Sequence, residues 1–401
     1  MINAKTILLY LKHYLDQTPL KAVEKAKKLM EQEPAYHVGE IKQRERIFFI
    51  GESPSLEERT VHARRMYSWI IGNENAKRRL QRLDRRALKN RNHSAAFKNV
   101  ALLGPSSVGK TSVGKARAKG LGLPFIEVHP RSIESCNDLL VYIGRVLDEF
   151  EVKVGDQTVT LGIIPPKPGH VILPPCIVLL DEVHALRDGI VNALLKATEK
   201  KDRTLVTEAG WTVDCSNVCW MIATTHRSRL FGPFKTRFTK ISLHPYSADE
   251  IADIIKVHLP LVPDDICERI AEIAGRIPRE VVDFAEDVSD EVEQSQVSWE
   301  TACETIRREW EIDEHGMTLQ RVNVLKALAL GPVSKARMID VTGCEDENEL
   351  LEVMSPLVMK LPDQLEPLVK IKAGKGYTLT MSGAAELQKR GIRYSDAALV
   401  A

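Results

Sequence analysis

The chain has 401 residues, of which 44% are hydrophobic and 28% charged, a balance typical of globular proteins with buried cores. Because 56 lysine and arginine residues nearly match 55 acidic ones, the net charge of +1 excludes a uniformly basic nucleic-acid coat and a uniformly acidic tail. With no apolar run near the roughly 20 residues that span a bilayer, and seven irregularly spaced cysteines, we expect a soluble, cytoplasmic protein of two or three domains with reduced thiols and no membrane contact.

Residues 1–66 are predicted to form two or three amphipathic helices, because apolar positions between Ile7 and Leu15 recur at spacings of three and four. We interpret this N-terminal helical extension as an accessory or docking region. Residues 77–98 then carry nine basic residues against the single acidic residue Asp84. Two interpretations of this basic segment stay open: a solvated helix face, or a surface near DNA or nucleotide phosphate.

Residues 99–243 alternate strand-like apolar runs with helical stretches, which predicts an α/β fold with a parallel sheet. From Ser247, where a capping box with Glu250 should begin a helix, the pattern is wholly helical. Residues 264–314 hold 17 acidic and 5 basic residues, so DNA is expected to bind elsewhere. The last segment predicts three short helices and a lysine-rich hairpin, the order of a winged helix. The predicted domains are therefore 1–66, 67–245 (nucleotide-binding), 246–313 (helical lid) and 314–401 (winged helix).

A glycine-rich octamer at 104–111 fits the phosphate-binding pattern GxxxxGK[ST], and it lies after a predicted strand and before a predicted helix. Its backbone amides should wrap phosphates, with the helix N-terminus adding its dipole. Lys110 should reach the β- and γ-phosphates, and the Thr111 hydroxyl should bind Mg²⁺. The predicted nucleotide-binding residues of this loop are Gly104, Pro105, Ser106, Ser107, Val108, Gly109, Lys110, Thr111 and Ser112.

A second motif follows about 70 residues later, where an apolar strand at 176–180 delivers two carboxylates at its end. We expect Asp181 to hold Mg²⁺ and Glu182 to polarise the attacking water. Thr225, at the end of the next strand, could orient the water and read the γ-phosphate, although a threonine there also suits a strand for its β propensity alone. Because unpaired buried carboxylates are costly, the two motifs together predict a nucleoside triphosphate hydrolase.

Two arginines could complete such a site. Arg237 precedes an aromatic residue and could act as an arginine finger on the γ-phosphate of a neighbouring subunit, or could form a surface salt bridge. Arg279 follows Pro278 at the start of a predicted helix and could point back at phosphate.

The order of these motifs resembles that of the AAA+ ATPases and, among them, the RuvB family of Holliday-junction branch-migration motors. Ile71 and Gly72 would then contact the adenine, and Thr225 would be a sensor where most AAA+ proteins carry asparagine. The link at 312–317 and the residues 331–333 resemble the entry into that family's winged helix. The resemblance implies a hexameric ring, ATP with Mg²⁺, and action on DNA in recombination and repair. The other matching segments are Asp181-Glu182-Val183-His184, Lys235-Thr236-Arg237-Phe238 and Ile277-Pro278-Arg279.

Three features depart from that family: the long N-terminal extension, an insertion at 151–173, and a short hairpin at 204–213. A protein partner is therefore expected through residues 1–66 or through the hairpin near Trp211. For Trp211 itself, an exposed position on a partner surface and a packed position at the sheet edge are both open.

DNA is expected at the wing rather than at the third helix of the winged helix, because residues 345–352 of that helix are densely acidic. Lys370, Lys372 and Lys375 flank a glycine-rich tip with Tyr377 and should contact double-stranded or branched DNA mainly through its backbone. A winged helix used for protein contacts is the alternative.

Two functions follow. The first is an ATP-driven helicase or translocase, with ATP bound between subunits and Arg237 supplied by the neighbour. The second is an ATP-switched assembly or loader protein that binds DNA and recruits a partner through its N-terminal helices. A protein-remodelling ATPase would need an aromatic pore loop after the second strand, and the sequence shows none that is convincing.

Overall fold

The structure is a computed structural model that falls into two units. Unit 2 contains the short segments Ile71–Asn73 and Pro105–Val108 and the chain from His244 onwards, and unit 1 contains the rest up to Leu243. The predicted helices before residue 56, residues 90–97 of the basic segment and the predicted DNA contact Lys375 lie outside the described residues. The structure describes residues 56–89, 98–148, 151–154, 157–160, 169–199, 201–225, 232–372, 374, 376–395 and 398.

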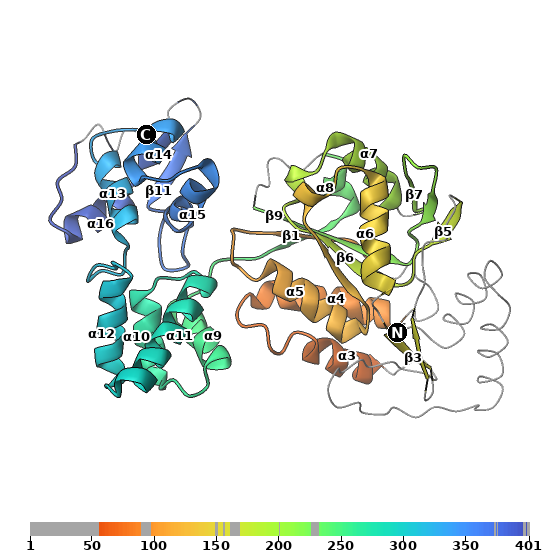
Figure 1. The fold of residues 1–401 in the computed structure, drawn as a ribbon, viewed down its shortest axis with the longest axis horizontal. Coiled ribbons are helices and arrows are strands. Elements are labelled where there is room, and N and C mark those ends of the chain that lie inside the picture. Colours follow the sequence, from red (N-terminus) through yellow and green to blue (C-terminus); the bar gives the residue numbers. More distant parts are fainter. Residues whose placement is uncertain are drawn as a thin grey trace. The chain divides into compact units, whose positions relative to one another are not determined.

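Unit 1 is built on a five-stranded parallel sheet with the order β10-β1-β9-β6-β2 (Figure 1). Every residue of the three central strands β1, β9 and β6 is buried, as expected for a parallel sheet that helices cover on both faces. This confirms the predicted α/β fold with a parallel sheet. The strands are β1 (Val100–Leu103), β2 (Phe125–Val128), β6 (Cys176–Leu180), β9 (Val218–Thr224) and β10 (Thr239–Ser242).

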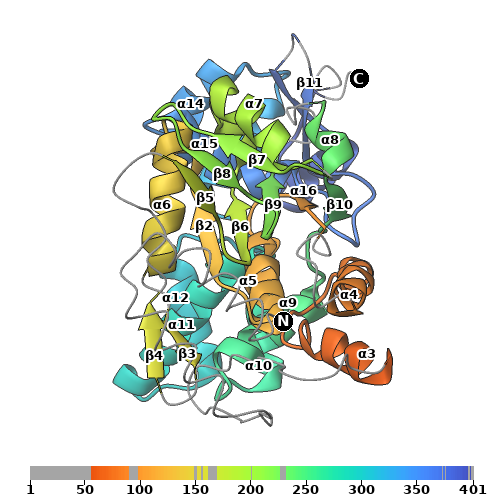
Figure 2. The ribbon, with the colours of Figure 1, turned by 90° about the vertical axis from the view of Figure 1, so that its right-hand side faces the viewer.

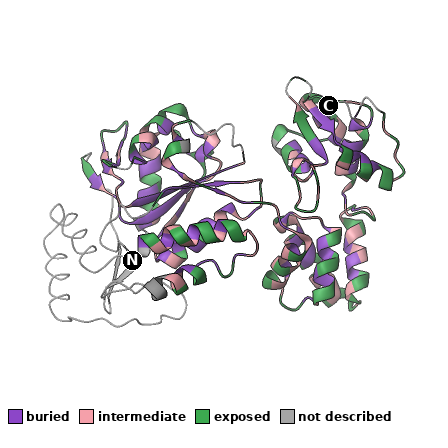
Figure 3. Cartoon of the chain, turned by 180° about the vertical axis from the view of Figure 1, so that it is seen from behind, coloured by how far each residue is buried: buried purple, intermediate pink, exposed green. Residues whose placement is uncertain are grey.

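Helices cover both faces of this sheet. One face carries α3 (Leu56–Arg65), α4 (Glu74–Lys89) and α5 (Lys110–Leu121), and the other carries α6 (Cys136–Asp148) and α7 (Asp188–Ala197) (Figure 1). The buried residues concentrate in the sheet and on the inward faces of the helices (Figure 3). The short helices η2 (Pro130–Ser132), η3 (Val183–Ala185) and α8 (Phe234–Arg237) follow strand ends or loops.

A second sheet in unit 1 has the order β5-β8-β7 (Figure 2). Its strands are β5 (His170–Ile172), β7 (Thr204–Val206) and β8 (Thr212–Asp214), so the predicted hairpin at 204–213 is confirmed. Within the insertion, β3 (Glu151–Val154) and β4 (Gln157–Thr160) form another antiparallel hairpin.

The interpretation of Trp211 as a partner surface is wrong, since its side chain is only 7% exposed. The backbone of Trp211 is held to Thr207 across the hairpin turn, and its indole packs into the main core of unit 1 with Leu205 and Val213. The packed position at the sheet edge is the one that the structure shows.

The first part of unit 2 is a group of helices around a core that runs from Tyr246 to Ile312. Helix α9 begins with the predicted capping box: the Ser247 hydroxyl accepts the Glu250 amide proton, and the Glu250 carboxylate accepts the Ser247 amide proton. The helices are α9 (Ala248–His258), α10 (Asp264–Ile273), α11 (Pro278–Ser295) and α12 (Trp299–Glu309).

The second part of unit 2 has its own core, from Met317 to Ala398. It contains α13 (Leu319–Leu328), α14 (Lys335–Thr342) and α15 (Glu347–Val358), then the antiparallel hairpin β11 (Val369–Lys372) and β12 (Gly376–Leu379), and finally α16 (Met381–Lys389). This is the order of elements on which the winged-helix prediction depends. That assignment and the four domain boundaries remain predictions.

Tyr377 does not lie on an exposed wing tip, which corrects the prediction. Its side chain is 4% exposed in the core of the C-terminal part, because Tyr377 and Leu379 are both on the inward face of β12. Its backbone also pairs with Val333.

Two further findings concern the chain as a whole. All seven cysteines are buried and free of disulfide bonds, in keeping with the predicted reduced thiols. Among the described residues, no helix combines the length and the apolar content that crossing a bilayer requires.

Candidate functional site

The loop after β1 turns sharply before it enters α5. Ser107 (φ 58°) and Gly109 (φ 81°) both adopt the left-handed region, which glycine reaches at no steric cost. Gly109 is the N-cap of α5, and the described structure shows no side chain capping this end. The first amide groups of α5 therefore have no acceptor within the helix and, with the helix dipole, form a ready site for phosphate.

Lys110 is the first residue of α5, and its side chain is only 7% exposed. Its ammonium group donates to the Gly104 carbonyl at 3.2 Å and lies 4.0 Å from Oε1 of Glu182. Burial lowers the pKa of Lys110, while the carboxylates of Glu182 and Asp181 act to raise it. The ammonium group thus lies between the loop that precedes α5 and the acidic end of β6.

Asp181 follows β6 directly and is half-buried. Burial and the adjacent charge of Glu182 raise its pKa, and the ammonium group of Lys110 opposes that rise. A site that destabilises a carboxylate charge in this way has room for additional positive charge. The Asp181 carboxylate and the Thr111 hydroxyl are hard oxygen donors, the kind that Mg²⁺ prefers, so the donor set fits this ion.

Glu182 is held from several sides. Its Oε2 accepts hydrogen bonds from the backbone amide of Thr225 at 3.3 Å and from the Thr225 hydroxyl at 3.2 Å. Nδ1 of His184 lies 3.1 Å from the same oxygen. The backbone of Glu182 is left-handed (φ 50°), a conformation that costs a non-glycine residue about 1–2 kcal/mol. Such strain is typical of functional positions, and here it fixes the direction of the carboxylate.

The structure therefore brings four of the predicted residues together: Lys110, Asp181, Glu182 and Thr225. Sequence reasoning assigned no role to His184, which also contacts Oγ1 of the buried Thr224 at 3.1 Å. The available signal was its position two residues after Glu182. For Thr225, the observed partner is the Glu182 carboxylate.

Arg237 lies in the short helix α8. Its guanidinium group pairs with Glu199 at 3.2 Å and donates to the Pro233 carbonyl at 3.4 Å, so within one chain it forms the salt bridge that was the alternative prediction. Both side chains are partly exposed, at 25% and 47%, and such pairs contribute little stability. The arginine-finger role stays a prediction.

The residues expected at the adenine and at the sensor helix belong to unit 2. Gly72 is left-handed (φ 64°), and a Cβ there would lie 2.5 Å from Oε1 of Glu250, so a larger residue would be strained and would displace the Glu250 side chain. Asn73 exchanges two hydrogen bonds with the backbone of His244. Arg279 is exposed and is the second residue of α11.

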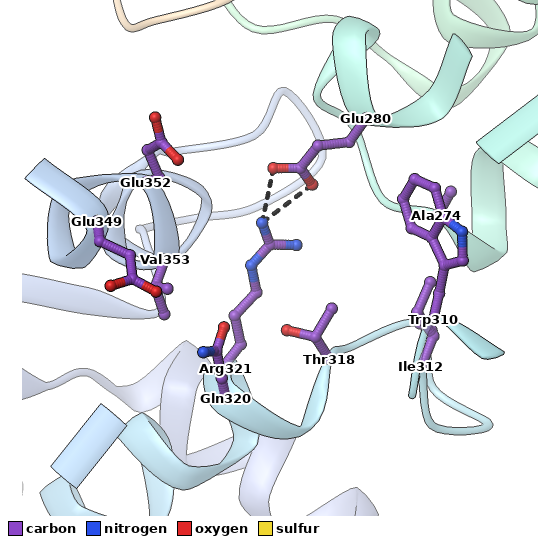
Figure 4. Close-up of a pocket in the computed structure, with 11 residues that line it drawn as sticks. Ala274, Glu280, Trp310, Ile312, Thr318, Gln320, Arg321, Glu349, Glu352 and Val353 are labelled. Carbon is purple, nitrogen blue, oxygen red and sulfur yellow. Dashed lines mark hydrogen bonds and ion pairs between the residues drawn. The ribbon is translucent and has the colours of Figure 1, made fainter. Parts of the chain in front are cut away.

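Ion pairs flank Arg279 on α11. Its neighbour Glu280 accepts two hydrogen bonds from Arg321 of α13, at 2.8 and 2.9 Å. Arg321 and Glu280 both line a pocket of about 260 Å³. Figure 4 shows the Arg321 guanidinium group pointing at Glu280, with Glu349 and Glu352 of α15 on its other side. Arg276, just before α11, makes a two-bond pair with Asp363. The start of α11 is thus tied to the C-terminal part of unit 2.

Two of the three predicted DNA-binding lysines are described. Lys370 is exposed on β11 and pairs with Glu366 at 2.5 Å, and Lys372 ends the same strand. Both lie on the hairpin, whereas Lys375 is outside the described residues.

Comparisons with known proteins agree with this geometry. Residues 100–246 match the model of the ATPase family associated with various cellular activities (AAA). The RuvB Holliday junction branch migration motor of Thermotoga maritima is similar in structure, with a TM-score of 0.59 at 19% identity over 79% of this chain and 95% of that one. A single-residue variant of that protein gives a TM-score of 0.58 over the same shares.

A curated relative, Lon protease 4 of Sorangium cellulosum, is 29% identical over 207 residues. The match covers 49% of this chain and 24% of the relative, so the chain spans about a quarter of that protein's length. Together these findings establish an AAA+ P-loop fold that resembles RuvB, and they support an ATPase of the AAA+ class.

Proposed function

We propose that this chain is an ATP-hydrolysing DNA motor that translocates double-stranded or branched DNA, as in branch migration of recombination intermediates. The observation that carries the proposal is the extent of the structural likeness. The AAA match ends at residue 246, but the likeness to RuvB covers 79% of this chain and so continues into unit 2. A nucleotide-binding domain shared by many ATPases would not account for the likeness to RuvB in unit 2.

In the proposed mechanism, the amide groups at the start of α5 and the ammonium group of Lys110 bind the phosphates of ATP. The Glu182 carboxylate orients a water molecule and accepts its proton, while the water oxygen bonds to the γ-phosphorus and the bond to the ADP oxygen breaks. Thr225 and His184 hold Glu182 in position for this step. Thr111 and Asp181 would hold Mg²⁺, which when bound neutralises phosphate charge.

The proposed active form is a ring of identical subunits, expected to be a hexamer. Arg237 of one subunit would stabilise the γ-phosphate bound by its neighbour, because the weak pair with Glu199 can be given up at little cost. Arg279 would contact phosphate from unit 2. On the hairpin, Lys370, Lys372 and Lys375 would bind the DNA backbone.

The test is the rate of ATP hydrolysis with and without duplex and four-way-junction DNA, at two salt concentrations. Strong stimulation that declines with salt is expected, since backbone contacts release counterions. Glu182→Gln should bind ATP and assemble normally but lose turnover, and normal turnover in this variant would remove Glu182 from its role.

If neither duplex nor four-way-junction DNA changes the ATPase rate, the proposal of a DNA motor is wrong. Deletion of residues 1–55, the part of the N-terminal extension before α3, then distinguishes the loader protein, which should lose its partner. A motor should keep DNA translocation after this deletion, because α3 is left in place.

A further inference from the structure

The exposed surface of α3 and α4 in unit 1 is strongly basic. Helix α4 carries seven basic residues and contains the first part of the basic segment 77–98, for which the sequence left two interpretations open. The last turn of α3, which packs against α4, adds two more exposed arginines. We call the exposed guanidinium groups of the two helices the arginine face: Arg64, Arg65, Arg78, Arg79, Arg82 and Arg86.

The one acidic residue of the basic segment does not moderate this surface. Asp84 is fully buried, where it accepts a hydrogen bond from Nε of Arg117 at 2.8 Å and from the Tyr67 hydroxyl at 2.5 Å. Its charge is therefore compensated inside unit 1, by α5. After Glu74 in its first turn, α4 therefore exposes basic side chains and no acidic one.

Within the described ranges, no acidic side chain pairs with any member of the arginine face, although Lys77 at the start of α4 pairs with Glu74. Arg78, Arg82 and Arg86 follow one another at four-residue spacing, so like charges lie side by side along the helix and repel. An unpaired row of this kind destabilises the free protein and is relieved by a polyanion.

We propose that the arginine face binds the phosphodiester backbone of DNA. A rise of 1.5 Å per residue places Arg78, Arg82 and Arg86 about 6 Å apart in sequence along one side of the helix, a row suited to a chain of phosphates. Five of the seven basic residues of α4 are arginines, whose planar guanidinium group binds phosphate oxygens in pairs. The inference rests on the proposed function in one respect, the choice of DNA as the polyanion. It adds a DNA contact surface in unit 1 to the one proposed on the hairpin of unit 2.

A second copy of this chain offers the competing occupant, through its acidic residues 264–314. Several of those carboxylates already have cationic partners within unit 2: Glu304 pairs with Arg307 and Arg308, Glu280 with Arg321, and Asp313 with Arg390. DNA brings uncompensated charges at regular intervals, which is why the observations favour it.

The experiment measures binding of fluorescently labelled duplex and single-stranded DNA to the full chain by anisotropy, over a series of salt concentrations. The variant is Arg78→Gln/Arg82→Gln/Arg86→Gln, and the control Arg131→Gln/Arg145→Gln/Lys196→Gln removes the same charge from exposed positions elsewhere in unit 1. The variant should bind duplex roughly tenfold or more weakly. Its log–log salt slope should be smaller by about 2.7 for duplex, or about 2.1 for single strands, from three lost phosphate contacts.

The control should keep the wild-type affinity, slope and unfolding temperature. The arginine variant should unfold at the wild-type temperature or slightly above it, because like charges are removed, and both variants should keep the DNA-free ATPase rate. Equal affinity and slope for the arginine variant and the wild type would overturn the inference, as would a wild-type chain that binds neither DNA at about 50 mM salt. Loss of self-association in sedimentation with DNA binding intact would assign the face to a second copy instead.

Failure of the motor looks different. If the arginine face binds DNA but DNA leaves the ATPase rate unchanged, the inference stands and the proposed function does not. If Lys370→Gln/Lys372→Gln abolishes binding while the arginine variant binds normally, the proposed function stands and this inference does not.

Discussion

The buried pair of Asp84 and Arg117 provides a sharp test of how α4 is attached to α5. Both side chains are 0% exposed. Burial lowers the pKa of Arg117, but the Asp84 carboxylate, together with Cys219 and Tyr67, raises it above its ordinary value, so the guanidinium group stays charged. Asp84→Asn keeps the shape of the side chain and the Tyr67 contact but removes the counter-charge, leaving an uncompensated cation in the interior.

Removing one partner of a buried ion pair costs about 3–5 kcal/mol, because the remaining charge has lost its water without gaining a counter-ion. Domains of this kind are stable by about 5–15 kcal/mol in total. For a unit of roughly 150–250 residues each kcal/mol lowers the unfolding temperature by about 2–4 °C, so the expected drop is about 6–20 °C. The contacts of Arg117 with the Lys98 carbonyl and the Cys219 sulfur remain, and they are too weak to replace a carboxylate.

Scanning calorimetry of the full chain measures this, with Glu134→Gln as the matched control. Glu134 pairs with Arg187 at 3.0 Å on the surface, where the two side chains are 72% and 62% exposed, so its loss should cost less than about 1 kcal/mol. The double variant Asp84→Leu/Arg117→Met, which removes both charges, should recover most of the loss. The reasoning fails if Asp84→Asn shifts the transition no more than Glu134→Gln does.

Three further predictions concern the site and unit 2. Thr225→Val removes a hydroxyl donor from the Glu182 carboxylate and should lower kcat for ATP about 10- to 100-fold with unchanged ATP binding, whereas Thr225→Ser should retain activity in the same steady-state assay. Arg321→Met breaks the two-bond link between α13 and α11 and should reduce DNA stimulation of the ATPase while the DNA-free rate is kept; equal stimulation would contradict the coupling. The Arg276 guanidinium group lowers the pKa of Asp363, so the pair stabilises the fold above the ordinary aspartate pKa of about 4, and this stabilisation is lost as the pH falls below that value. Asp363→Asn should therefore make the unfolding temperature, measured by calorimetry, depend less on pH between about pH 5 and 3.

The candidate site was predictable because its residues stand at the ends of strands that the sheet order makes neighbours. Strands β1, β9 and β6 lie side by side and parallel, so their carboxyl ends meet at one edge. Lys110 follows the first of these strands, Thr225 follows the second, and Asp181 and Glu182 follow the third. In the sequence each of these polar residues comes after its apolar strand, which was enough to place it at the carboxyl end of that strand.

The partners of these residues were harder to predict, since they depend on the direction of single side chains. Asp84 and its partner Arg117 are 33 residues apart, and nothing in the local pattern of α4 distinguishes an inward carboxylate from an outward one. Tyr377 and Trp211 both lie beside turns of short hairpins, where a one-residue difference decides between core and solvent. Composition near a glycine turn suggested exposure for both, and the structure buries both side chains.

The first turn of α11 carries Arg279, and residues on both sides of Arg279 are tied to the C-terminal part of unit 2. Arg279, the residue proposed to contact phosphate, is covalently next to Glu280, whose carboxylate holds Arg321 of α13. On its other side Arg276 holds Asp363, which lies between α15 and the hairpin with Lys370. Because both pairs have two hydrogen bonds, a rotation of this turn must either break them or carry α13 and the segment before β11 along with it. A displacement of Arg279 by nucleotide would therefore be transmitted to the proposed DNA-binding hairpin without any additional element.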